Sequence, residues 1–170
     1  MDLFDAMKSR KIAKHFKPNP VSEDSLKRIF NAARLAPSVD NLQPWKVIAV
    51  RDEDLKKKVA AACGTKAMAE APVILVACGM PDDAYPFVGG YLNAYPMDVS
   101  AMLSHMLLAA TAEGLCALLV HTFKEEQVAE ALAIPPDAKV VGVMPIGYGE
   151  GETERLEGKN VSDLVSYDHF

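Results

Sequence analysis

Two short stretches of the sequence are dense in side chains that could bind a ligand. The first, SRKIAKHF at residues 9–16, carries the cations Arg10, Lys11 and Lys14. A strip of this kind can hold an anion such as a phosphate, because Arg forks onto two oxygens and Lys adds a third donor. Composition alone favours a solvated basic surface instead, in which each charge contributes about 0–1 kcal/mol. The strip therefore needs support from elsewhere in the chain.

The second stretch is the corner APSVDNLQPW, residues 36–45, between a predicted helix and a predicted strand. A plain helix-to-strand turn explains Pro37, and it explains Asn41 as a residue in the left-handed region. It does not explain why Ser, Asn, Gln and Trp occur together in so short a connection. The corner is therefore a candidate binding element as well as a turn.

The sequence contains none of the common motifs for phosphate, metal or nucleophilic sites. GxGxxG, GxxxxGK[ST], HExxH, CxxC, HxH and GxSxG are all absent, and the histidines are scattered at His15, His105, His121 and His169. If the protein is an enzyme, its side chains do not supply the reactive group, which indicates a bound cofactor. Three cysteines without CxxC spacing indicate reduced core thiols and a cytoplasmic protein.

Apolar periodicity and capping residues predict the elements that must position these stretches. We expect helices at 2–8, from Ser22 to before Pro37, after the cap Asp52, at 97–113 and at about 125–133. We expect strands at 45–51, 71–79, 115–123 and 139–149, and a long loop at 80–96. The run at 71–79 is continuously apolar, as in a strand buried on both faces. The prediction is a layered α/β fold, with one sheet of four or five strands and helices on both sides.

The helix at 97–113 is apolar around almost its whole circumference, which predicts burial on all sides. A homodimer could enclose such a helix more readily than one chain. The last 20 or so residues are polar and irregular, and such a tail would be free unless it docks somewhere, for example on a partner subunit.

Bulk properties exclude several classes of protein. The length of 170 residues suits a single domain, 1–170, and half of the residues are hydrophobic. The net charge of −5 argues against nucleic-acid binding driven by overall charge. No apolar run reaches the roughly 20 residues that span a bilayer, and the N-terminus lacks the pattern of a signal peptide. We therefore expect neither a nucleic-acid nor a membrane partner.

Three segments together resemble the nitroreductase family of flavoenzymes. They are the strip SRKIAKHF, the corner APSVDNLQPW and the later stretch LLAATAEGLCALLVHTF, and the corner is the most specific of them. The resemblance implies an α+β, nitroreductase-like fold whose central sheet is mixed, mainly antiparallel and four- to five-stranded, flanked by helices. It also implies a homodimer with FMN at the subunit interface and a C-terminal extension exchanged between the subunits.

The resemblance assigns the strip to the FMN phosphate and to one edge of the ring. Arg10 would fork onto phosphate oxygens and Lys11 would add a donor. Ile12 stands where the family usually has Ser, so only its backbone N–H could contribute. Lys14 would lie near the N1–O2 edge and raise the two-electron potential. Arg155 resembles a C-terminal phosphate-binding Arg, with Lys159 as a possible substitute.

The resemblance assigns the corner to the partner subunit's flavin. Pro37 and Pro44 would hold its backbone, while Gln43 and Trp45 would brace it. The residues that would lie against the ring or bond to its polar parts are Pro37, Ser38, Val39 and Asn41.

The third segment would run past the flavin at Leu119 and Val120. The backbone N–H of His121 or Thr122 would then point at flavin N5, so that no side chain need be catalytic. Thr65 would face the pyrimidine end of the ring.

The implied activity is ping-pong hydride transfer from NADH or NADPH, through flavin N5, to a nitroaromatic, quinone or similar conjugated acceptor. One alternative is a same-fold flavoenzyme with other chemistry, of the reductive dehalogenase or flavin-fragmenting type. Another is a non-catalytic flavin-binding module. The loop at 80–96, with Tyr85, Phe87, Gly89, Gly90 and Tyr91, would cover the site and set specificity.

Overall fold

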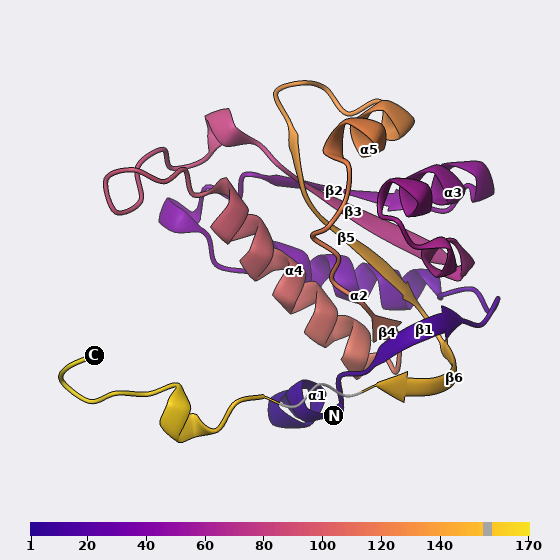
Figure 1. Ribbon diagram of the computed structural model, residues 1–170, viewed down its shortest axis with the longest axis horizontal. Helices are drawn as coiled ribbons and strands as arrows, with labels where there is room; N and C mark the ends of the chain where they lie inside the picture. Colours follow the sequence, from indigo (N-terminus) through magenta and orange to yellow (C-terminus); the bar gives the residue numbers. More distant parts are fainter. Residues whose placement is uncertain (155–157) are drawn as a thin grey trace.

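The computed structural model describes residues 1–154 and 158–170, and antiparallel strands form its centre (Figure 1). A four-stranded sheet has the order β2-β3-β5-β4, from β2 (Trp45–Val50), β3 (Val73–Gly79), β5 (Lys139–Gly147) and β4 (Cys116–Ala117). A separate two-stranded ribbon pairs β1 (Ile12–Phe16) with β6 (Gly149–Glu154). Both sheets contain only antiparallel pairs among the described strands. The mainly antiparallel sheet of the prediction is therefore confirmed.

Strand β3 lies at the centre of the larger sheet, and all seven of its residues are buried. Successive side chains of a strand point to opposite faces. Val73, Leu75 and Ala77 accordingly pack into one core, whereas Ile74, Val76 and Cys78 pack into the other. The sequence is continuously apolar here because the strand has a hydrophobic core on each side.

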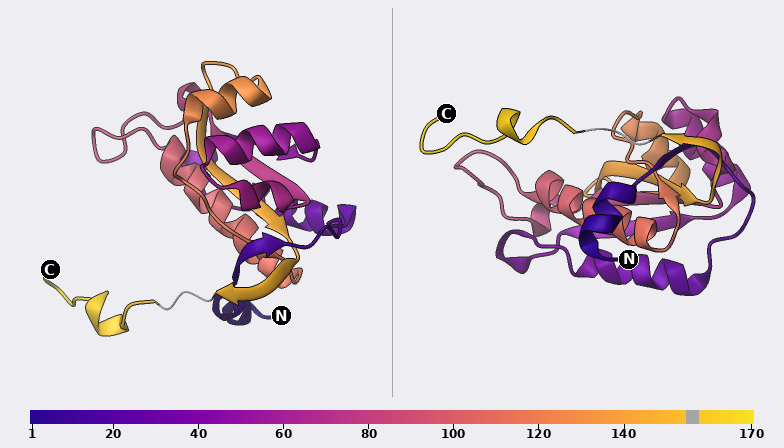
Figure 2. Two further views of the ribbon diagram at one scale, coloured as in Figure 1. Left: turned by 45° about the vertical axis from the view of Figure 1, so that its right-hand side comes forward. Right: turned by 90° about the horizontal axis from the view of Figure 1, so that it is seen from below.

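Helices cover both faces of this sheet, as predicted (Figures 1 and 2). On one face lie α2 (Glu23–Arg34) and α4 (Tyr95–Ala112), and on the other lie α3 (Glu53–Ala62) and α5 (Glu125–Leu132). The short α1 (Leu3–Ser9) packs on α4. Ser22 caps α2 through the Ser25 N–H, and Asp52 caps α3 through the Leu55 N–H, which confirms both predicted helix starts.

Two expectations about the elements were wrong in part. The predicted strand at 115–123 is reduced to β4 and a single bridge between Val120 and Val143. Pro145 of β5 explains the gap, because it has no N–H and can only accept a bond from Leu118, at 3.4 Å. The C-terminal stretch begins with the paired strand β6 rather than as a free tail.

The burial of α4 in one chain is incomplete, and its burial in a homodimer stays a prediction. Met97 is 47% exposed, and Ser100 and Ser104 are also exposed on the same helix. Residues 158–170 are exposed as well and extend away from the rest of the chain (Figure 2). The exchange of this segment between subunits stays a prediction.

No helix in the described ranges, 1–154 and 158–170, is both long and apolar enough to cross a membrane.

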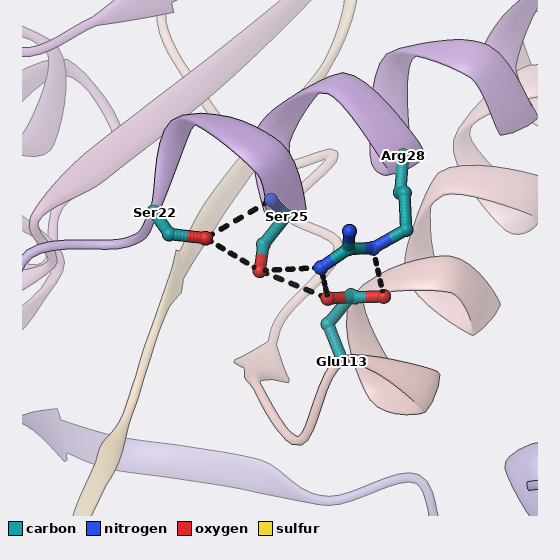
Figure 3. A network of polar contacts seen from close by, with 4 residues as sticks. All are labelled: Ser22, Ser25, Arg28 and Glu113. Carbon is teal, nitrogen blue, oxygen red and sulfur yellow. Dashed lines mark hydrogen bonds and ion pairs between the residues drawn. The ribbon is translucent and has the colours of Figure 1, made fainter.

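A polar network joins the start of α2 to the end of α4 (Figure 3). The Arg28 guanidinium donates two hydrogen bonds of 2.6 Å to the Glu113 carboxylate, and the Ser25 hydroxyl donates a third, of 2.9 Å. The Glu113 side chain is only 18% exposed. These bonds, chiefly those from Arg28, lower the pKa of Glu113 below its ordinary 4.5. The network therefore clamps two helices that cover the same face of the sheet.

Glu113→Gln is expected to destabilise the protein in a pH-dependent way. A carboxyl whose pKa is lower in the folded state stabilises it above the ordinary pKa, and this contribution disappears as the pH falls through the lowered value. We expect the Tm to fall by about 2–4 °C at pH 7, and by much less below about pH 4. Thermal unfolding followed by circular dichroism measures both. Glu23→Gln is the matched control, because its pair with Arg51 is exposed on both sides. Equal losses at pH 7 and pH 3 would contradict the assignment.

Candidate functional site

A pocket of about 360 Å³ lies between β1 and the edge of the four-stranded sheet. Its volume falls in the range of small-molecule sites, roughly 300–1,000 Å³. Buried Met68, Leu118 and buried Pro145 give it an apolar wall, and Lys14 brings a cation. The whole lining consists of Ile12, Ala13, Lys14, His15, Phe16, Thr65, Met68, Leu118 and Pro145.

Close packing at two glycines sets the distance between the β1-β6 ribbon and the sheet. A Cβ on Gly149 would lie 2.9 Å from the Cys116 sulfur and 3.2 Å from the Ala13 Cβ. A Cβ on Gly147 would lie 2.5 Å from the Pro72 Cδ. Any larger residue at either position must push the ribbon outward. The glycines therefore fix β1, and with it Lys14, against the wall of the pocket.

A hydrogen bond between two side chains holds the other side of the pocket. The His15 Nδ1 lies 3.0 Å from the Glu70 Oε2, and the same oxygen accepts the Phe16 N–H at 3.4 Å. Glu70 ends the short helical turn Lys66–Glu70, which follows Thr65. The pair thus keeps Thr65 beside β1, although Thr65 is distant from the strip in sequence. Sequence reasoning had predicted Thr65 but missed both partners of this pair.

The cationic strip is only partly drawn into the pocket. Ile12 and Lys14 line the pocket. Arg10, the C-cap of α1, and Lys11, directly before β1, are both exposed and do not line it. Arg155 lies outside the described residues, and Lys159 is exposed in the C-terminal segment. The structure is compatible with a phosphate outside the pocket near Arg10 and Lys11, and this role stays a prediction.

Residues 118–122 form the outer edge of the sheet next to the pocket. Val120 exchanges both backbone bonds with Val143, at 2.8 and 2.9 Å. Backbone groups alternate in direction along a strand, so the N–H groups of Leu119 and His121 point away from β5. Within the described part of the chain, neither of these N–H groups donates a backbone bond, and the same holds for Thr122. The alternation favours His121 over Thr122 as a donor to a ligand at this edge.

The His121 ring is hydrogen-bonded to the backbone of β5. Its Nδ1 lies 3.0 Å from the Val141 carbonyl oxygen. A carbonyl can only accept, so Nδ1 donates in this bond. That no side chain here acts as a dedicated acid stays a prediction.

The corner is a rigid and partly strained turn. Asp40, Asn41 and Gln43 have φ values of +51°, +56° and +50°, in the left-handed region that non-glycine residues rarely adopt. The Ser38 hydroxyl accepts the Gln43 N–H at 2.9 Å, and the Gln43 side chain donates to the Arg34 carbonyl at 3.0 Å. Gln43 therefore braces the corner, as predicted. Trp45 packs against the core beneath it.

The corner lies at the opposite end of the chain from β1 (Figure 1), whose residues line the pocket. The Val39 N–H bonds to Asp98 in the first turn of α4, whereas Leu118 of the pocket follows the last turn. A helix of 18 residues spans about 27 Å. Pro37, Ser38, Val39 and Asn41 therefore cannot contact a ligand in the pocket of their own chain.

The loop at 80–96 lies at the corner end of the molecule. Its two arms are joined by bonds from Ala94 N–H to the Tyr85 carbonyl and from the Asn93 side chain to the Pro81 carbonyl. Gly89 and Gly90 make its tip with positive φ, and Tyr85, Phe87 and Tyr91 are exposed. It does not cover the pocket of its own chain.

A larger hollow of about 510 Å³ adjoins the pocket at Thr65 and is lined mainly by small side chains of α3. It brings together no group with evident chemistry. Among the described residues, no three His, Cys, Asp or Glu side chains are placed to hold a metal ion.

Two of the cysteines are poor candidates for reactive groups. Burial raises the pKa of Cys63 to about 11 and that of Cys78 to about 11. Only the thiolate is nucleophilic, so we expect alkylation by iodoacetamide at pH 8 to be roughly a hundredfold slower than for a free thiol of pKa about 8.5. Mass spectrometry of the native protein measures this, with the urea-unfolded protein as control. Rapid native labelling of either residue would contradict it.

The sheet and the pocket define an α+β protein with a pocket at the sheet edge. Residues 7–73 and 62–148 match the nitroreductase family. An NADH dehydrogenase of Thermus thermophilus is 30% identical over 178 residues, which cover 87% of this chain and 87% of that protein. A 5,6-dimethylbenzimidazole synthase of Rhodobacter capsulatus is 30% identical over 176 residues, covering 87% and 84%.

The crystal structure of a nitroreductase family protein from Clostridium difficile has a TM-score of 0.88 at 25% identity, with 100% of both chains covered. The chain therefore belongs to the nitroreductase family, and it is an oxidoreductase of that family, as its three segments predicted.

Proposed function

We propose that the protein is an FMN-dependent oxidoreductase that takes hydride from NADH or NADPH and passes two electrons to a nitroaromatic, quinone or similar conjugated acceptor. The observation that carries the proposal is the pocket between β1 and the sheet edge at Leu118 and Pro145, in which Lys14, Thr65 and an apolar wall meet. The names of relatives, among them an NADH dehydrogenase, support the choice of electron donor.

The residues present fit FMN. Met68, Leu118 and Pro145 offer an apolar surface for a flat ring, and Lys14 offers a charge at its edge. Arg10 and Lys11 lie outside the pocket, where a phosphate dianion would stay hydrated on one side. FMN, when bound, supplies the atom that accepts a hydride and later gives it up.

The protein's own groups would bind the flavin and orient its ring. Lys14 favours negative charge beside it and so favours a reduced ring over an oxidised one. The backbone N–H of His121, directed outward from the sheet edge, can donate to a ring nitrogen and fix its position. Apolar residues such as Met68 exclude water from one face. No side chain is needed as a general acid.

The second face of the site would come from a partner subunit. Since the corner cannot contact the pocket of its own chain, we propose a homodimer in which residues 37–41 of each chain cover the flavin of the other. The open face of α4 and the exposed residues 158–170 are surfaces that such a dimer would bury. We further propose that residues 1–170 form one domain and that the protein is cytoplasmic, in keeping with its three free cysteines.

One alternative has a specific observation in its favour. The Rhodobacter capsulatus relative, a 5,6-dimethylbenzimidazole synthase, supports flavin-fragmenting chemistry at the same site. Reductive dehalogenation and plain flavin binding are further outcomes of the same test.

The test is the visible spectrum of the purified protein, before and after NADH or NADPH is added without oxygen. We expect a flavin spectrum that bleaches with the donor and returns when a quinone is added. A flavin that does not bleach would leave a non-catalytic module, and release of a flavin fragment under oxygen would identify the fragmenting branch. A protein that stays colourless after incubation with FMN would overturn the proposal.

A further inference from the structure

Asp98 is a buried carboxylate that no predicted role uses. It lies in the first turn of α4 and is only 4% exposed. Its Oδ1 accepts the Val39 N–H at 3.1 Å, whereas its Oδ2 has no hydrogen-bond partner in the part of the chain that the structure describes. A buried carboxylate is unfavourable unless it is well bonded, so this one needs an explanation.

Two features make the carboxylate tolerable in this position. The N-terminal turn of a helix favours negative charge, because its free N–H groups carry partial positive charge. An ionised acceptor also makes a stronger bond to a backbone N–H than a neutral one does. Both features strengthen the bond to Val39 rather than any contact within α4.

The bond to Val39 connects the corner to the helix layer. Ser38 is extended and begins the short helical turn Val39–Asn41, whose Asp40 and Asn41 have positive φ. Other hydrogen bonds that join the corner to the rest of the described chain lie at its end. The Gln43 side chain donates to the Arg34 carbonyl, and the Pro44 carbonyl accepts the Met80 N–H. Asp98 is thus the tie at the start of this strained turn.

We propose that Asp98 is a positioning residue, which fixes residues 38–41 in the shape that covers the flavin of the partner subunit. This inference rests on the proposed function for its consequence in catalysis. Its structural part, the control of the corner by Asp98, can be tested without any flavin.

The test compares Asp98→Ala, which removes the acceptor, with Asp98→Asn, which keeps an acceptor oxygen. In the flavin-free protein we measure hydrogen exchange of the Val39 amide and the fluorescence of Trp45, the only tryptophan, which ends the corner. We expect the Val39 amide to exchange at least about tenfold faster in Asp98→Ala, with little change in Asp98→Asn and in core amides of β3. We expect Trp45 to become more accessible to acrylamide in Asp98→Ala alone.

In the FMN-loaded protein we measure the Kd for FMN and the kinetic constants. We expect Asp98→Ala to weaken FMN binding by roughly tenfold and to raise KM for the acceptor more than it lowers kcat, with recovery in Asp98→Asn. Asp82→Ala is the matched control, because it removes an exposed carboxylate at the same end of the molecule.

A second variant keeps the test decisive if Asp98→Ala does not fold. Val39→Pro removes the donor, at the first position of a helical turn that follows an extended residue, where Pro is well tolerated. In a Val39→Pro background, we expect Asp98→Ala to cause no further increase in the accessibility of Trp45 to acrylamide. If Asp98→Ala does not fold, Val39→Pro alone must make Trp45 more accessible. If Trp45 accessibility is unchanged in every variant, and exchange of the Val39 amide is unchanged in Asp98→Ala, the proposal is wrong.

Failure of the proposed function looks different. In that case the wild-type protein would bind no FMN, while the flavin-free measurements would still respond to Asp98→Ala. A different result would exclude the positioning role in the flavin site. In that result the wild-type protein binds FMN and Asp98→Ala changes Val39 exchange and Trp45 accessibility, but the variant leaves the Kd for FMN and the KM of the acceptor unchanged.

Discussion

Replacing both Arg10 and Lys11 by Gln is expected to weaken FMN binding by at least about a hundredfold while leaving riboflavin binding almost unchanged. Each charged hydrogen bond to a phosphate is worth about 1.5–3 kcal/mol, and every 1.4 kcal/mol is about tenfold in Kd. Riboflavin has no phosphate, so it does not make these bonds. Quenching of flavin fluorescence on titration with the flavin-free protein gives both Kd values.

Two sets of variants separate a phosphate site from general surface charge. Lys8→Gln with Lys17→Gln removes the exposed lysines on either side of the strip and should change the Kd for FMN by less than about threefold. Lys14→Gln, in the pocket, should weaken FMN and riboflavin equally. If the Arg10 and Lys11 variant loses both flavins alike, or the flanking pair has the same effect, the phosphate assignment is wrong.

Mixing two inactive variants is expected to restore activity. One variant, Lys14→Glu, damages the pocket, and the other, Ser38→Ala with Asn41→Gly, removes the corner's polar side chains. Glycine keeps the positive φ of Asn41 available, whereas Ser38→Ala also removes the acceptor of the Gln43 N–H within the corner. We expect each alone to retain on the order of 1% of wild-type kcat/KM, because each loses one or two charged or polar contacts to the flavin.

Subunit exchange then creates dimers with one intact site. Random pairing of equal amounts places about half of the molecules in mixed dimers, so about a quarter of all sites combine an intact pocket with an intact corner. We expect activity near this fraction after co-refolding or co-expression. Each variant mixed with itself is the control. If the corner acted within its own chain, no mixed dimer would contain an intact site, and activity would stay near 1%.

Local chemistry in the sequence predicted most elements of the fold. Ser22 and Asp52 cap their helices within one turn, and the seven-residue core of β3 needs only its own apolar run to be recognised. The early end of β4 could not be foreseen, because it depends on Pro145, which lies nearly thirty residues away in the chain and stands opposite Leu118 in the sheet. The apolar circumference of α4 predicted burial on all sides, more readily in a homodimer than in one chain, and in the single chain residues such as Met97 on this helix are exposed.

The site was predictable only where a motif is continuous. The strip and the corner are both contiguous, and the resemblance to the family rests on them. Met68, Leu118 and Pro145 give no signal in the sequence, because each is an ordinary apolar residue that the register of distant strands brings to one pocket. Glu70 and Asp98 are single acidic residues whose partners, His15 and Val39, lie 55 and 59 positions away. Such long-range pairs need the fold before they can be recognised.

The pairing of β1 with β6 has a consequence for how the protein is made. On the ribosome, β1 emerges among the first residues, but its hydrogen-bonding partner at 149–154 emerges only after the four-stranded sheet is complete. Pairing between segments so far apart in the chain is slow to form. The nascent polypeptide must therefore carry its cationic strip unpaired through nearly all of translation. Loading of the proposed cofactor would accordingly be a late step, which follows synthesis of the sheet rather than guiding it.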